Sequence, residues 1–225
     1  MKFSTSLFCQ ILQIMPRSSF LRLVYDSKAE RHAKGFSSWD QYVAMLFCQL
    51  AQAKSLREIS DGLAITCGKL SHLGLRNAPA KSTLSYANAH RPWKLYQDVF
   101  FHLRDFCRSE STGKKKRFHF KNKLLSLDST TVDLCLSLFP WADFRQTKGA
   151  IKLHLLLDHD GYLPDFAVIT DGKTADSTAA HNFTLPAGSI VAVDRGYYDF
   201  DLFAQWNNSV SFLLRVLKAM PLMKS

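Results

Sequence analysis

The chain has 225 residues, of which 47% are hydrophobic and 21% are charged, a composition typical of a globular protein and not of a disordered or fibrous one. It carries 29 Lys and Arg against 19 Asp and Glu, a formal net charge of +10. No stretch approaches the ~18 uncharged apolar residues that a membrane-spanning helix needs, so we expect no membrane-spanning helix.

The charge is unevenly distributed along the chain. Residues 1–127 hold 21 Lys and Arg against 8 Asp and Glu, net +13, whereas residues 128–225 hold 8 against 11, net −3. This asymmetry predicts a polyanion-binding arm joined to a separate chemical module. Charge alone does not distinguish a nucleic acid from an anionic membrane surface as the partner.

The cysteines indicate a reducing compartment. There are 5 of them, widely scattered and without any C-x-x-C pair, which argues against a zinc ribbon or a disulfide framework. The apolar N-terminal run, residues 3–15, is interrupted by glutamines and lacks a small-residue cleavage site, so we expect no signal peptide. The predicted location is the cytoplasm.

Residues 1–110 are predicted to form an all-helical domain. Apolar side chains recur at spacings of three and four residues over 39–50, with Ser37 or Ser38 as a cap. Ser55 and Glu58 have the spacing of a capping box at the start of a second helix. Further helices are predicted over residues 81–91 and 93–107. Their order resembles a helix-turn-helix, but the loop at 64–80 is too long for its compact form, so a solvated basic face remains the alternative.

A basic linker is predicted over residues 111–123. Its charged residues are Lys114, Lys115, Lys116, Arg117, Lys121 and Lys123. Two interpretations are open: the segment is a solvated linker, or it is a strap that contacts DNA phosphates and gains affinity by releasing counterions.

The remaining residues, 124–225, predict strands that alternate with short helices, which is an α/β plan with a mixed sheet. The predicted strands are 124–134, 151–157, 162–170, 189–193 and 210–216. The predicted helical segments are 176–183 and 200–206. Asp160-Gly161 is the signal for a hairpin between the second and third strands.

Two aspartates interrupt strands that the pattern predicts to be buried. Asp128 follows the apolar run 124–127, and Asp194 follows Ile190-Val191-Ala192-Val193. A buried carboxylate is costly unless it is hydrogen-bonded, paired or bound to a metal, and carboxylates are preferred ligands of Mg²⁺. Two interpretations remain: each aspartate caps a turn, or both share a metal site.

The residues around these aspartates resemble a known family. Leu127-Asp128-Ser129-Thr130, Val193-Asp194-Arg195-Gly196-Tyr197 and Phe212-Leu213-Leu214-Arg215 are similar to the catalytic core of bacterial insertion-sequence transposases of the insertion sequence four type. The N-terminal part also looks like the helical domain that often precedes this core. The resemblance implies an α/β fold with a helical N-terminal domain and a truncated RNase H-like mixed-sheet core, and a DDE-type recombinase.

Several residue roles are implied by this resemblance. Asp128 and Asp194 become the first two metal ligands, for Mg²⁺ or Mn²⁺, in a two-metal site. Arg195 and Arg215 join the linker lysines as contacts to double-stranded DNA at transposon ends. Gly196 allows a positive φ or a close backbone approach. A second copy of the chain or a full-length transposase is a further expected partner, and no membrane is expected.

The third carboxylate of the family is a glutamate in a later helix, whereas no Glu follows Asp128 in this sequence. We therefore expect a catalytically incomplete, C-terminally truncated transposase that binds DNA. Two alternatives remain: a non-catalytic or inhibitory remnant, and a residual metal-dependent nuclease that recruits Asp133 or Asp199. His154 and His159 are not expected to bind a metal, and Tyr197 is expected to pack beneath its turn.

Overall fold

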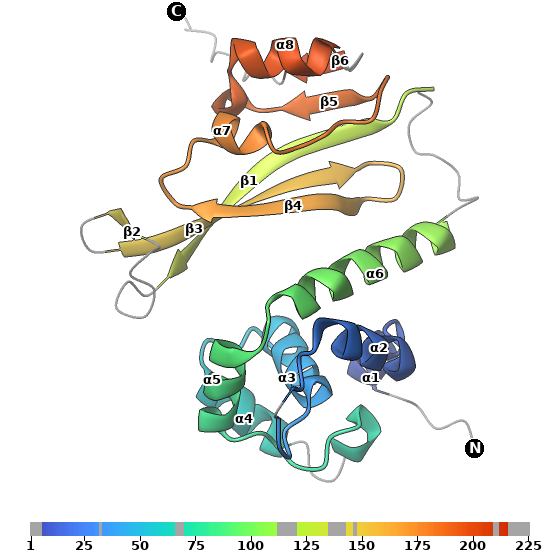
Figure 1. The fold of residues 1–225 in the computed structure, drawn as a ribbon, viewed down its shortest axis with the longest axis vertical. Coiled ribbons are helices and arrows are strands. Elements are labelled where there is room, and N and C mark those ends of the chain that lie inside the picture. Colours follow the sequence, from blue (N-terminus) through green and yellow to red (C-terminus); the bar gives the residue numbers. More distant parts are fainter. Residues whose placement is uncertain are drawn as a thin grey trace, which may run out of the picture. The chain divides into compact units, whose positions relative to one another are not determined.

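The computed structural model describes residues 6–31, 33–65, 70–111, 121–134, 143–145, 148–208 and 212–215. The chain forms two compact units, residues 1–105 and 106–225. The first is helical and the second is built on a β-sheet (Figure 1). A helical N-terminal region followed by a mixed sheet with helices confirms the predicted fold class. The expected linker and its boundaries stay a prediction, because residues 112–120 lie outside the described ranges.

The helices of the N-terminal region follow one another closely. They are α1 (Leu7–Gln13), α2 (Arg17–Ser27), α3 (Ser38–Leu50), α4 (Leu56–Ile65), the 3₁₀ turn η1 (Leu70–Leu73), α5 (Lys81–His90) and α6 (Lys94–Ser111). The sequence pattern predicted α3, α4, α5 and α6 individually, whereas α1 and α2 were expected only as part of a helical domain.

The caps of α3 and α4 are local and readable in the sequence. Ser37 Oγ accepts the backbone N–H of Asp40 at 3.1 Å, and Asp40 accepts the N–H of Ser37 at 2.9 Å, which completes a capping box. At α4, the N–H of Glu58 donates to Ser55 Oγ at 3.2 Å, but the Glu58 carboxylate reaches the N–H of Lys54 instead. Both caps satisfy backbone donors that have no partner within the helix.

An aromatic core holds the first unit together. Phe20 is fully buried and packs edge-on against Trp39, with ring centroids 5.3 Å apart. The Trp39 indole donates to the carbonyl of Leu73 at 2.9 Å, so its one polar atom is satisfied. Arg91, after α5, donates to the carbonyl of Ser37 at 2.8 Å and to Gln41 Oε1 at 2.9 Å. These bonds fix α5 against the start of α3.

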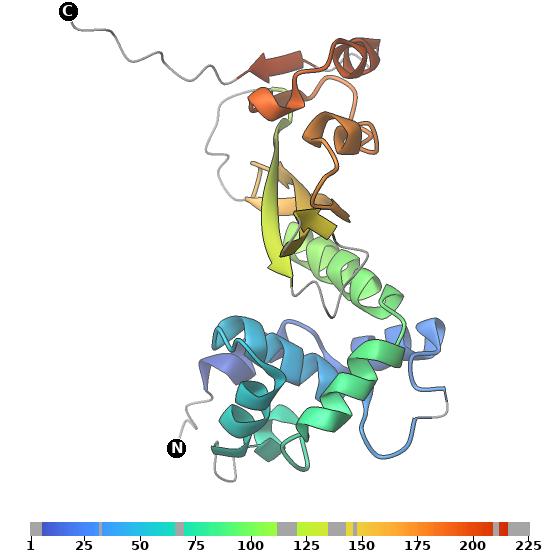
Figure 2. The same ribbon diagram turned by 90° about the vertical axis from the view of Figure 1, so that its left-hand side faces the viewer.

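The second unit is a six-stranded mixed sheet with β1 at its centre (Figure 2). The strands are β1 (Leu124–Leu134), β2 (Asp143–Arg145), β3 (Lys148–Asp158), β4 (Leu163–Asp171), β5 (Ile190–Val193) and β6 (Phe212–Arg215). β3 pairs antiparallel with β1 on one side and with β4 and β2 on the other. β5 pairs parallel with β1, and β6 pairs parallel with β5.

The hairpin between β3 and β4 confirms the predicted turn, although its strained residue is not the glycine. The connection covers residues 159–162, and the positive φ, 55°, falls on Tyr162. Beyond β4, the short helix α7 (Asp176–Ala180) and α8 (Phe200–Asn208) complete the unit, with a 3₁₀ turn, η3 (Arg195–Tyr197), between β5 and α8.

The core of this unit lies on the helical face of the sheet. Because side chains alternate along a strand, Leu125 and Leu127 of β1 share a face with Val191 and Val193 of β5, and all four are buried. Ala180, Tyr197, Leu202 and Trp206 join them in one cluster. Within the described residues, no helix combines the length and the apolar character needed to cross a bilayer.

Candidate active site

Asp128 and Asp194 lie side by side at the point where β1 and β5 stop pairing. The parallel register matches Leu127 with Val193; Asp128 is the next residue of β1, and Asp194 is the first residue after β5. Neighbouring strands run about 4.8 Å apart, so the backbones of the two aspartates lie close together. The structure therefore brings together the two residues that the sequence singled out.

The expectation that these aspartates are buried is wrong: both are exposed. Leu127 and Val193 occupy the helical face of the sheet, so period-two alternation turns Asp128 to the opposite face. Asp194 lies beyond the last residue of β5, where no strand covers it. Neither carboxylate consequently needs a metal to offset the cost of burial.

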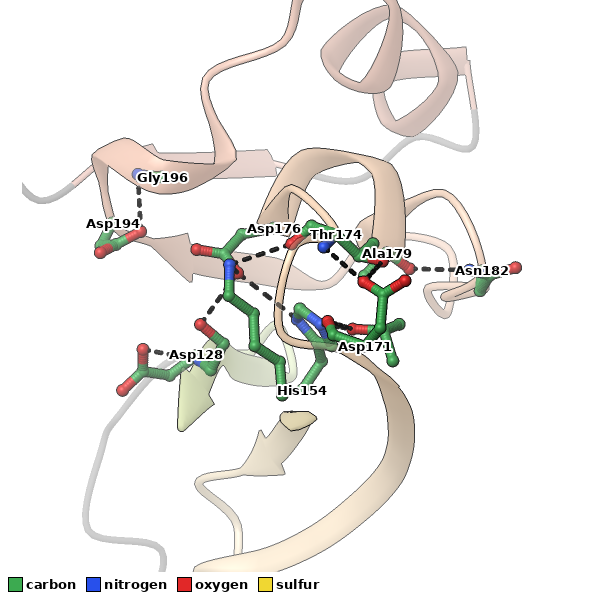
Figure 3. A network of polar contacts seen from close by, with 12 residues as sticks. Asp128, His154, Asp171, Thr174, Asp176, Ala179, Asn182, Asp194 and Gly196 are labelled. Carbon is green, nitrogen blue, oxygen red and sulfur yellow. Dashed lines mark hydrogen bonds and ion pairs between the residues drawn. The ribbon is translucent and has the colours of Figure 1, made fainter. Parts of the chain in front are cut away.

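One oxygen of each carboxylate is held by the backbone. Asp128 Oδ1 accepts the N–H of Ser129 at 2.8 Å, and Asp194 Oδ1 accepts the N–H of Gly196 at 2.8 Å (Figure 3). Asp194 is thus the N-cap of η3, so the turn-capping interpretation is confirmed for this residue. The second oxygen of each receives no hydrogen bond from any described residue. Capping therefore leaves one oxygen of each aspartate available to a ligand.

Gly196 is required for close approach and not for backbone conformation, since its φ is not positive. A methyl group added at Gly196 would lie 2.8 Å from Asp176 Oδ2 and 3.1 Å from Asp194 Oδ1. Any larger residue would push one of these two carboxylates away.

Asp176, which sequence reasoning did not select, is the centre of the polar contacts in this region. Its Oδ1 accepts the hydroxyl of Ser129 at 3.0 Å and the ammonium of Lys152 at 3.2 Å (Figure 3). Lys152 also donates to the carbonyl of Thr174 at 2.9 Å. The sequence signal was weak, because Asp176 falls in a polar run that predicts only a short helical connection.

The two histidines have structural partners. His154 is fully buried on β3, and its Nε2 lies 2.9 Å from Thr170 Oγ1. Burial lowers the pKa of His154, against the opposing effect of the Asp176 carboxylate, whose Oδ1 is 3.8 Å from Nδ1. His159 Nε2 lies 3.0 Å from Ser126 Oγ.

The two tyrosines after Asp194 differ in their environment. Tyr197 is fully buried in the core beneath its turn, and burial, with the negative charge of Asp176, raises the pKa of its hydroxyl. Tyr198 is half exposed and packs edge-on against Phe200.

Asp199, a possible substitute ligand, is used as a helix cap. Its Oδ1 accepts the N–H of Asp201 at 2.9 Å and that of Leu202 at 3.1 Å, and the hydrogen bond from Leu202 is the largest cause that lowers its pKa. The side chain of Asp133 lies outside the described residues.

The basic residues predicted to contact DNA fall into three groups. Lys121 and Arg195 are exposed. Lys123 forms salt bridges within the protein instead, since its ammonium lies 3.1 Å from both Asp158 and Asp165. Outside the described part of the chain lie Lys114, Lys115, Lys116, Arg117 and the side chain of Arg215.

The carboxylate oxygens of Asp128 and Asp194 suit a hard divalent cation, but they are too few to surround it. Asp128 and Asp194 offer exposed carboxylate oxygens on adjacent strands, which is the ligand type that Mg²⁺ and Mn²⁺ prefer. Among the described residues, no group of three or more His, Cys, Asp or Glu side chains is arranged to hold a metal. If a metal were bound, these residues would supply two protein ligands, and water or substrate oxygens would complete the shell.

Comparison with known proteins agrees with this geometry. Residues 4–76 match a domain of unknown function, DUF4372, and residues 119–223 match the transposase DDE domain. A probable transposase for insertion sequence element IS5377 from Geobacillus stearothermophilus is 24% identical over 120 residues, which cover 53% of this chain and 31% of that protein. The chain thus spans about a third of this relative's length. The mixed sheet with its helices is consistent with the RNase H-like core of such domains. Residues 119–223 of this chain are thus similar to the transposase DDE domain.

Proposed function

We propose that this chain is a transposase-family protein that binds double-stranded DNA and holds a divalent metal between Asp128 and Asp194. The observation that carries the proposal is the register of β1 and β5, which sets the two aspartates side by side within the matched DDE domain. The proposed DNA is the end of an insertion element, and a second copy or a longer transposase is the proposed protein partner.

The chemistry proposed for the site is phosphoryl transfer. A bound Mg²⁺ would polarise a phosphate oxygen and assist the departure of the leaving oxygen. The chain's own part is to orient the ligands: the N–H groups of Ser129 and Gly196 each fix one carboxylate oxygen of Asp128 and Asp194, and the second oxygen of each is proposed to bind the metal. Arg195 is exposed and next to Asp194, which supports a contact between its guanidinium group and a phosphate.

DNA binding is assigned to the basic N-terminal region. Residues 62–97 contain 5 Lys and Arg and no Asp or Glu. Within this stretch, α5 buries Leu84 and Ala87 and leaves Lys81, Ser85 and Tyr86 exposed. A helix with an apolar inner face and a cationic, hydrogen-bonding outer face suits contact with a duplex.

In this proposal, Asp128 and Asp194 correspond to two of the three acidic residues of the family's catalytic site. No glutamate follows Glu110. We therefore propose that the chain as given binds DNA and metal but does not by itself carry out strand transfer.

The test for DNA binding uses fluorescence anisotropy with a labelled duplex at about 50 and 200 mM salt. We expect binding at the lower salt that weakens strongly at the higher, because phosphate contacts release counterions. Lys81→Ala is expected to reduce the slope of the logarithm of the binding constant against the logarithm of the salt concentration by about 1. Lys34→Ala serves as the matched control, because Lys34 is exposed but lies outside residues 62–97. Absence of binding at 50 mM salt would overturn the proposal.

The test for the metal site uses Mn²⁺, whose free ion is counted by electron paramagnetic resonance. Asp128→Asn and Asp194→Asn are each expected to weaken binding, and Asp201→Asn, an exposed aspartate on α8, is expected to leave it unchanged. A plasmid assay with Mn²⁺ is expected to show no strand transfer. Nicking that Asp194→Asn abolishes would instead assign the residual nuclease activity.

A further inference from the structure

Asp176 touches the chain beside both candidate metal ligands, although it lies on a different element. It is the first residue of α7, with a side chain only 20% exposed. One oxygen accepts the hydroxyl of Ser129, the residue after Asp128, at 3.0 Å. The other oxygen faces Gly196, whose N–H holds Asp194. The Asp176 carboxylate therefore forms a bridge between β1, through its hydrogen bond with Ser129, and the turn after β5, through its close contact with Gly196; Figure 3 shows these residues.

The position of Asp176 is itself fixed from a third strand. Lys152 of β3 lies 3.2 Å from Asp176 Oδ1, and its ammonium also donates to the carbonyl of Thr174, just before α7. The two charged side chains are 19% and 20% exposed, so the pair is mostly shielded from solvent. A charge-assisted bond in such a setting is stronger and more directional than one at the surface.

The sheet does not need this bridge in order to form. β1 is already paired with β3 and with β5 by backbone ladders. β3 still pairs with Asp128 and Ser129, but the pairing of β1 with β5 ends at Leu127 and Val193, so the ladders do not set the position of the chain after Val193 relative to Asp128. Asp176 contacts both parts, Ser129 on β1 and Gly196 in the turn after β5.

We propose that Asp176 is a positioning residue that sets the relative placement of Asp128 and Asp194 through Ser129 and Gly196. The proposal rests on the proposed function in that it assigns the two aspartates to a shared metal. Outer partners of this kind typically change metal affinity by 10–100-fold when they are removed.

The test compares Asp176→Leu with Asp176→Asn in the full chain, with Asp201→Asn as the matched loss of an exposed carboxylate. Leucine keeps the number and branching of the side-chain heavy atoms but has no acceptor, whereas asparagine keeps one oxygen for Ser129. We expect Mn²⁺ affinity to fall by about tenfold for Asp176→Leu and by less for Asp176→Asn. A role limited to long-range charge would make the two variants equal, which would overturn the proposal.

A second measurement reads the positioning without metal. The amide protons of Ser129 and Gly196 are bonded to Asp128 and Asp194, so their NMR chemical shifts report these hydrogen bonds. We expect both to shift in Asp176→Leu and neither in Asp201→Asn. Ser129→Ala removes the same bridge from β1 and is expected to act likewise if Asp176→Leu does not fold.

The two proposals fail in different ways. If the wild-type chain does not bind Mn²⁺, the metal site is refuted, and the NMR shifts still decide the role of Asp176. If the wild type binds Mn²⁺ but Asp176→Leu binds it equally well, with both amide shifts unchanged, the positioning role is refuted while the metal site stands.

Discussion

The carboxylate of Asp165 is predicted to stabilise the second unit by binding two cations that flank the basic segment. Arg108, near the end of α6, lies 2.6 Å from Asp165, and Lys123, just before β1, lies 3.1 Å from it. Asp158 receives the same two cations at 3.6 and 3.1 Å. Both ends of the segment 109–122 are thus fixed to the hairpin of β3 and β4.

The magnitude follows from partial burial of this cluster. The Arg108 and Asp165 side chains are 33% and 17% exposed. Hydrogen bonds to charged groups contribute about 1.5–3 kcal/mol, and exposed ion pairs only about 0.2–1 kcal/mol. Because Asp158 remains to hold both cations, we expect Asp165→Asn to cost about 1–2 kcal/mol, or roughly 5 °C in the melting temperature of a unit of this size.

The pH dependence has a definite sign. Burial by itself would raise the pKa of Asp165, but the hydrogen bonds and charges of Lys123 and Arg108 outweigh it and lower the pKa. A depressed folded-state pKa contributes stability above the unfolded value of about 4, and this contribution is lost as the pH falls through the folded value. The difference between wild type and Asp165→Asn should therefore be full at pH 7 and shrink below about pH 4.

Thermal unfolding followed by circular dichroism at pH 7 and at pH 3, in low and in high salt, measures this difference. Asp201→Asn is the control, since its carboxylate is exposed on α8. A melting temperature of Asp165→Asn within 1 °C of wild type at pH 7 and low salt would refute the reasoning.

Three further predictions concern the sheet and its site. Gly196→Ala should weaken Mn²⁺ binding in the titration described above, because its methyl group would displace the carboxylate of Asp176 or Asp194; unchanged affinity would contradict this. The lowered pKa of His154 means that the unfolded chain binds more protons, so stability should decrease as the pH falls below about 6.5, and His154→Gln should flatten this dependence in melting curves between pH 5 and 7.5. Leu127→Ala should cost about 2–5 kcal/mol in urea unfolding, because Leu127 is 2% exposed in the core; a loss below 1 kcal/mol would contradict the packing.

Much of the local structure was readable from the sequence because it depends on neighbouring residues. The cap at Ser37, the helical spacing of α3 and the strand character of β1 are local properties, and the structure confirms them. The apolar runs that end at Asp128 and Asp194 likewise marked where two strands carry a carboxylate.

Tertiary structure alone decided how these pieces combine. Periodicity shows that a segment is a strand, but it does not specify which strand pairs with which, and the register of β1 with β5 is what sets the two aspartates side by side. Periodicity also could not show that Asp128 and Asp194 are exposed: Asp128 lies on the face of β1 opposite the helices, and Asp194 lies where β5 gives way to a turn. Asp176 was missed for the same reason: it meets Ser129 across 47 residues of chain, a contact created by the path of α7 over the sheet and not by any local pattern.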